Sequence, residues 1–84
     1  MYIHIGQETV IKKSEIVGIF DLDNTTVMAK TRDFLNKAEK NGQVITVSFE
    51  LPKSFIICEK NGKKTVYITP ISTATLLKRN ETII

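Results

Sequence analysis

An Asn61-Gly62 pair between two β-rich segments constrains the fold of this chain more than any other feature. The flanking segments, Phe55–Glu59 and Thr65–Thr69, are rich in β-branched and aromatic residues, which favour extended backbone. A type I′ turn between antiparallel strands needs positive φ at both central residues, a conformation that asparagine and glycine adopt readily. The sequence therefore predicts a β-hairpin across this part of the chain.

The other segments are β-rich runs and two stretches with helical spacing. We expect four further strands, at Tyr2–Ile5, Thr9–Lys12, Ile16–Phe20 and Val44–Phe49. Gly18, inside an otherwise apolar run, suggests a bulge. A helix is expected over Val27–Asn41, and a second, shorter helix after Pro70. This order of elements predicts an α+β fold: one small, mostly antiparallel sheet, a packed helix and a short C-terminal helix.

Both expected helices carry apolar side chains on one face. In the longer helix, three residues recur at helical spacing and are expected to pack on the sheet: Val27, Phe34 and Leu35. The shorter helix has Ser72 or Thr73 as its N-cap, and we expect Leu76 and Leu77 to face the interior. Residues 80–84 are expected to form a loose tail.

Length and composition limit the classes of protein that fit. Eighty-four residues, 42% of them apolar, are expected to form a single domain, residues 1–84. The only cysteine, Cys58, excludes a disulfide within the chain and fits a reducing compartment. No apolar run is long enough to cross a bilayer, and the first residues lack the apolar stretch of a signal peptide. We therefore expect a cytoplasmic protein with no membrane partner.

One segment carries a pattern of residues used in catalysis. Asp21, Asp23 and Thr25 follow an apolar strand, as in the nucleophile loop of haloacid-dehalogenase-like phosphatases. That chemistry also needs a parallel α/β sheet, Mg²⁺ ligands and a distant lysine, for which a chain of this length and hairpin pattern has no room. We interpret the segment as a strand end followed by a helix cap, with acids that complement the helix dipole. We therefore expect no catalytic residues and no enzyme.

A metal or cofactor site is not expected either. His4 is the only histidine and Cys58 is the only other soft ligand, and their spacing matches no zinc site. The four glycines are scattered along the chain and form no phosphate-binding loop. We interpret His4 and Cys58 as ordinary residues of the sheet.

Basic residues are the remaining candidates for function. The formal net charge is +3, from 12 Lys and Arg against 9 Asp and Glu, which permits an anionic partner. Most of the positive charges are lysines, which suit phosphate contact better than base reading. One interpretation is a solvated rim; the other is that several lysines gather on one edge and contact phosphate.

Three segments match a known group in order and spacing. They are His4-Ile5-Gly6, Ile16–Phe20 and Tyr67–Leu76. On these segments the chain resembles the RemA/RemB-type extracellular-matrix regulators, and most closely the RemB branch, over about residues 2–79. The resemblance implies a compact domain similar to LytTR-type DNA-binding domains, which assembles into rings and regulates transcription of biofilm-matrix genes.

The same resemblance locates a candidate site. In RemA-like members an arginine-rich turn follows the strand after the first helix. The matching turn here is Glu50-Leu51-Pro52-Lys53, in which only Lys53 is positive. Glu15 stands where RemA-like members carry a basic residue.

Two functions therefore stay open. The first is a regulator that binds double-stranded DNA as a homo-oligomer, with Lys53 as the first candidate for phosphate contact. Lys12, Lys13, Lys78 and Arg79 are further candidates on charge alone. The second is a ring-forming structural or protein-interaction module that does not bind DNA. A steep salt dependence of duplex binding would distinguish the first from the second.

Overall fold

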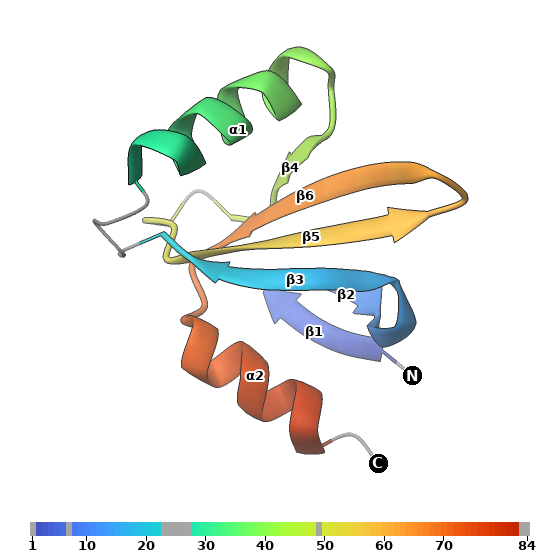
Figure 1. Ribbon diagram of the computed structural model, residues 1–84. Coiled ribbons are helices and arrows are strands. Elements are labelled where there is room, and N and C mark those ends of the chain that lie inside the picture. Colours follow the sequence, from blue (N-terminus) through green and yellow to red (C-terminus); the bar gives the residue numbers. More distant parts are fainter. Residues whose placement is uncertain (1, 7, 23–27, 49, 83–84) are drawn as a thin grey trace.

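The computed structural model describes residues 2–6, 8–22, 28–48 and 50–82 (Figure 1). The strands are β1 (Tyr2–Gly6), β2 (Thr9–Lys12), β3 (Ile16–Asp21), β4 (Val44–Thr46), β5 (Ser54–Lys60) and β6 (Lys63–Thr69). The helices are α1 (Met28–Lys40) and α2 (Thr73–Thr82), and a 3-10 turn spans Lys13–Glu15. The α+β class and the order of elements are confirmed, although β4 is shorter than expected. The likeness to LytTR-type domains stays a prediction.

The strands form two sheets instead of the single antiparallel sheet expected. β1 and β2 pair with each other, and a four-stranded sheet has the order β3-β5-β6-β4. β5 is antiparallel to both β3 and β6, whereas β4 runs parallel to β6. β3 and β4 are therefore parallel to each other. Parallel strands need a long connection, and here α1 forms the crossover between them. The sequence did not predict this arrangement, because the alternation of apolar and polar side chains along a strand does not show which other strand it pairs with.

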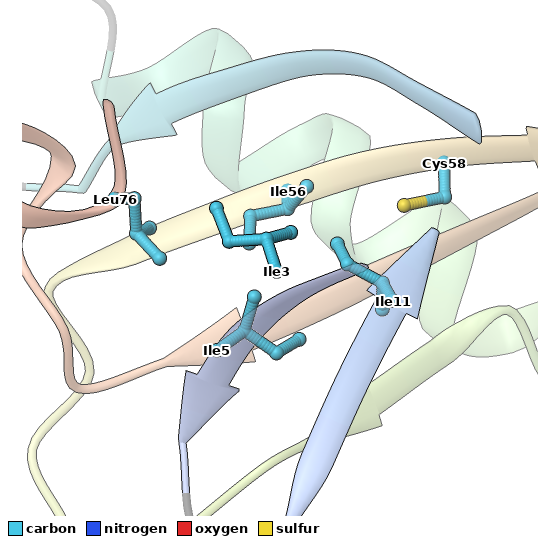
Figure 2. Close-up of a cluster of buried hydrophobic side chains, with 6 residues drawn as sticks. All are labelled: Ile3, Ile5, Ile11, Ile56, Cys58 and Leu76. Carbon is cyan, nitrogen blue, oxygen red and sulfur yellow. The ribbon is translucent and has the colours of Figure 1, made fainter. Parts of the chain in front are cut away.

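The large sheet lies between two layers (Figure 1): α1 covers one face, and the β1–β2 hairpin with α2 covers the other. The main core fills the second interface. Its buried residues come from β1, β2, β5 and α2, and their side chains face one another in Figure 2: Ile3, Ile5, Ile11, Ile56, Cys58 and Leu76. The separate hairpin is therefore held by apolar packing on the sheet and not by strand pairing with it.

A smaller core lies under α1. Its buried residues are Ala38, Phe55 and Val66. Leu35 packs against this cluster, as expected, but Phe34 is 40% exposed, and its ring lies 6.2 Å from the Phe55 ring between centroids. The expectation of a buried Phe34 is wrong, because this side chain lies at the edge of the cluster and not between α1 and the sheet. Val27 lies outside the described residues.

The bulge predicted at Gly18 is present in β3. The register of β3 against β5 shifts between Ile16 and Gly18. A Cβ atom on Gly18 would come within 2.6 Å of the Phe20 ring. The missing side chain lets the Phe20 ring lie over the strand, where it stacks on Phe55 at 5.0 Å between ring centroids.

The β5–β6 hairpin is confirmed in its register and its turn. Ser54 pairs with Thr69 at one end and Lys60 with Lys63 at the other. Asn61 has φ 52° and Gly62 has φ 80°, the positive values that a type I′ turn requires.

Replacing Gly62 with valine is therefore expected to cost about 1–2 kcal/mol, because a β-branched residue is strained at positive φ. No atom lies within 4 Å of the Cβ position at Gly62, so the cost comes from backbone strain and not from a clash. Gly62→Asn is the matched control, since asparagine tolerates this region. Urea denaturation of the two variants measures the difference, and equal stabilities would contradict the strain argument.

The ends of the helices follow from local hydrogen bonds. After α1, the N–H of Gly42 donates to the oxygen of Glu39 at 3.0 Å and the N–H of Gln43 to that of Ala38 at 2.9 Å, as in a Schellman motif. Ser72 caps α2, because its Oγ accepts from the N–H of Thr75 at 3.3 Å. The candidate caps of α1, residues 24–26, lie outside the described residues.

The expectations for the last helix were right at Leu76 and wrong at Leu77. Leu76 is fully buried, whereas Leu77 is 48% exposed. Consecutive residues on a helix point about 100° apart, so only one of the pair can face the narrow interface with β1 and β3. The helix also continues to Thr82, so the loose tail expected from residue 80 is wrong over residues 80–82.

Candidate nucleic-acid interface

The turn Glu50–Lys53 is an exposed loop with an anchored backbone. The side chains of all four residues are exposed. At its start, the buried Ser48 accepts a hydrogen bond from the N–H of Glu50 at 3.2 Å. At its end, the N–H of Lys53 donates to the oxygen of Thr69, and the oxygen of Lys53 accepts from Leu22, both at 2.9 Å. Lys53 thus extends into solvent from a backbone position tied to β6 and to the end of β3.

Lys12 and Lys13 lie at the other end of the sheet. Lys12 ends β2 and Lys13 begins the 3-10 turn that leads into β3, whereas Leu22, which bonds to Lys53, directly follows β3. A strand of six residues is about 20 Å long, and Figure 1 shows the β2–β3 connection and the start of β5 at opposite ends. Lys12 is exposed and Lys13 is half-buried. The structure therefore does not bring these two lysines together with Lys53.

Lys78 and Arg79 differ in their surroundings although they are adjacent in α2. Lys78 is exposed, whereas Arg79 is half-buried and its Nη1 donates to the backbone oxygen of His4 at 2.8 Å. Arg79 thus ties α2 to β1. The start of α2 lies at the Lys53 end of the sheet, because β6 ends at Thr69 and leads into the helix (Figure 1).

The opposite end of the sheet collects more lysines than the Lys53 end. The tip of the β5–β6 hairpin adds Lys60, Lys63 and Lys64 to the pair before β3. Two acids lie among them: Glu15 is 4.0 Å from the Nζ of Lys60, and Glu59 is opposite Lys64 in the register. Glu15 therefore lies at the end of the sheet opposite the Lys53 turn.

Cys58 is a packed thiol in the main core. Burial, with a smaller contribution from the charge of Glu15, raises its pKa to about 11. Burial also raises the pKa of Tyr67, with the charges of Cys58 and Glu15 adding to it. A thiol with this pKa stays protonated at neutral pH and is a poor nucleophile.

The other candidates for chemistry give no assembled site in the described part of the chain. Asp21 is exposed at the end of β3, and Asp23 and Thr25 lie outside the described residues. Among residues 2–6, 8–22, 28–48 and 50–82, no three His, Cys, Asp or Glu residues are grouped as metal ligands would be. Within the same residues, neither helix is long and apolar enough to cross a membrane.

Known proteins match this chain over nearly its whole length. A family model described as RemA-like, Extracellular matrix regulatory protein A-like, matches residues 2–79. The chain is 37% identical over 79 residues to the Extracellular matrix regulatory protein B of Bacillus subtilis (strain 168), which covers 94% of this chain and 89% of that protein. Both names describe regulatory proteins and not enzymes. The residues matched by the family model include the three segments on which the resemblance in the sequence rests.

Proposed function

Because the chain belongs to the RemA-like family of extracellular matrix regulatory proteins, we propose that it regulates transcription by binding double-stranded DNA as a homo-oligomeric ring in the cytoplasm. The observation that supports DNA binding most is the anchored turn Glu50–Lys53. Its side chains are exposed, while its backbone is hydrogen-bonded to the Ser48 hydroxyl at one end and to Thr69 of β6 at the other. A rigid turn loses little conformational entropy when a phosphate binds to its lysine.

Each subunit contributes a weak electrostatic attraction. Lys53 is the one positive charge in its turn and shares that turn with Glu50. Lys78, exposed on α2, is the second candidate. Lysine contacts to phosphate position a protein without reading bases, so repetition of the contact around a ring supplies affinity, and DNA shape supplies specificity.

Exposed apolar side chains on both outer strands of the large sheet support a ring. At one edge, β3 exposes Val17 and Phe20, and at the other, β4 exposes Ile45. Edge strands with apolar side chains favour pairing with another chain. Contact between two different edges is head-to-tail, and such contacts close into a ring when the rotation per subunit allows it.

The native protein is expected to bind random duplex DNA at low salt, with an affinity that falls steeply as salt rises. Lys53→Glu reverses the charge in every subunit and is expected to weaken binding by more than about tenfold. Lys37→Glu makes the same change of charge at an exposed position on α1, outside the proposed interface, and is expected to retain most of the binding. Fluorescence anisotropy at low and moderate salt measures all three proteins.

Equal losses in the two variants would remove Lys53 from the interface. If the native protein forms an intact oligomer that does not bind DNA at low salt, the structural or protein-interaction module becomes the better description.

The oligomer itself is tested by light scattering. We expect a mass several times that of the 9.5 kDa chain at micromolar concentration. Val17→Lys places a charge on the exposed edge of β3 and is expected to lower that mass without unfolding the subunit, because the side chain is already exposed. Lys12→Gln, on the separate hairpin, is the control. A native protein with the mass of a monomer would contradict the ring.

A further inference from the structure

The layer that covers one face of the large sheet is displaced toward β4. α1 contacts β4, and Val44 of that strand packs against the smaller core beneath the helix. Phe20 of β3 points to the same face, because it is paired with Phe55, which is buried in that core. Phe20 is nevertheless 43% exposed. α1 therefore covers the β4 side of this face and leaves Phe20, at the β3 side, in contact with solvent.

The layer on the opposite face is displaced the other way, toward β3. α2 contacts β3, and Ile16 and Ile19 of that strand pack against the main core. Ile45 points to this face, because it follows Val44 in β4 and is paired with Tyr67, which packs against the same core. Ile45 is 46% exposed. This layer therefore leaves the β4 side of its face bare, and the two layers are staggered across the sheet (Figure 1).

Phe34 enlarges the bare surface beside β3. It is 40% exposed on α1, and its ring lies 6.2 Å from that of Phe55 between centroids. Phe20 stacks on the same buried ring at 5.0 Å. Two exposed rings from different elements therefore meet at one buried ring and form an apolar step, with α1 as its wall and β3 as its floor. Exposed apolar surface that gathers in this way is typical of a protein contact site.

A second copy of the chain fits both bare surfaces at once. β3 and β4 are the two outer strands of the sheet. When β4 of one copy lies beside β3 of the next, a rotation about an axis along the strands keeps the same face of each sheet on the same side. The α1 layer of the first copy, displaced toward β4, then extends over the step of the second. The α2 layer of the second, displaced toward β3, extends over Ile45 of the first.

Two-fold arrangements cover less of the exposed apolar surface. A two-fold contact between two β3 edges, or between two β4 edges, reaches only one of the two bare surfaces and leaves the other in water. Burial of apolar area is the dominant favourable contribution to most protein association. The head-to-tail contact is therefore favoured, because it removes both surfaces from water.

We propose that copies join head to tail through these staggered layers. α1 of one copy covers Phe20 and Phe34 of the next, and α2 of that next copy covers Ile45 of the first. The proposal rests on the homo-oligomer proposed above and specifies which faces form its contact, and DNA binding is not part of it.

Two lysine variants each block one side of the contact. Phe34→Lys charges the step beside β3, and Ile45→Lys charges the bare surface of β4. Both side chains are partly exposed, so each variant is expected to fold, which circular dichroism and urea denaturation check. Light scattering at micromolar concentration is expected to give the mass of a single chain for each variant, whereas the native protein gives an oligomer.

A mixture of the two variants is the sharpest measurement. Phe34→Lys keeps an intact Ile45 surface, and Ile45→Lys keeps an intact step, so one copy of each can still form one contact. The mixture is expected to give a mass of two chains, which neither variant reaches alone at the same total concentration. A mixture that stays monomeric, like its components, would overturn the proposal.

Val10→Lys is the matched control. Val10 is 54% exposed and precedes the buried Ile11, so it lies on the outer face of the β1–β2 hairpin, away from both bare surfaces. This variant is expected to keep the native mass. Native mass in either Phe34→Lys or Ile45→Lys, or an equal loss in Val10→Lys, would refute this contact while the ring itself stands. A native protein with the mass of a monomer would instead contradict the ring, and this inference with it.

Discussion

Replacing Leu76 with alanine is expected to destabilise the protein by about 2–5 kcal/mol, the usual cost of truncating a fully buried leucine. Leu76 is 0% exposed and packs with residues of β1, β2 and β5 in the main core (Figure 2). The loss is a large part of the about 5–15 kcal/mol that stabilises a typical domain. Urea denaturation followed by circular dichroism measures it.

The neighbouring leucine supplies the control. Leu77→Ala makes the same chemical change in the same helix, so the change in helix propensity is shared, but Leu77 is 48% exposed. We expect it to cost less than about 1 kcal/mol. If the two variants lose equal stability, α2 does not pack on the sheet through Leu76.

Replacing Thr69 with valine is expected to destabilise the protein by about 1–3 kcal/mol although the side chain keeps its shape. Thr69 is 0% exposed. Its Oγ1 donates to the backbone oxygen of Ile5 and accepts from the N–H of Ile71 at 3.2 Å. This hydroxyl joins the β1–β2 hairpin to the end of β6 and to the segment that leads into α2. Valine leaves the buried oxygen of Ile5 and the half-buried N–H of Ile71 without this partner. Thermal denaturation measures the cost.

The residue opposite Thr69 in the register is its control. Ser54 is also 0% exposed and is paired directly with Thr69. In the described part of the chain, its Oγ is the buried side-chain oxygen that has no hydrogen-bond partner. Ser54→Ala removes a desolvated hydroxyl, so stability is expected to stay the same or to rise. If Ser54→Ala lowers stability as much as Thr69→Val does, the effect does not come from the hydrogen bonds of Thr69, and the prediction is wrong.

Local features of the sequence determined most of the secondary structure. The Asn61-Gly62 turn needs positive φ at two adjacent residues, and few other pairs accept it, so the hairpin and its register follow from the turn. The C-terminal end of α1 and the bulge at Gly18 were predictable for the same reason, because each depends on residues close to it in the sequence. Interactions between residues close together in the sequence can therefore be predicted from the local pattern of residue types.

The tertiary structure alone decided how these elements pair and which side chains they bury. The parallel entry of β4 beside β6 depends on how α1 crosses the sheet, and the separate β1–β2 hairpin depends on packing against Ile56 and Leu76. Phe34 and Leu77 are apolar and have the spacing of a buried helix face, yet both are exposed. Each helix contacts the sheet through a narrow strip of its surface, and these two side chains lie at the side of that strip.

For the charged residues too, the sequence determined some features and the tertiary structure determined others. The sequence determined that the chain is rich in lysine and that one lysine, Lys53, ends the turn before the hairpin. Only the register of β3 against β5 decided that Lys12 and Lys13 lie at the far end of the sheet from it, and only the packing of α2 decided that Arg79 binds the backbone of His4. The pairing of β4 with β6 joins segments about 20 residues apart, and contacts between segments so distant in the chain arise only when the sheet has assembled.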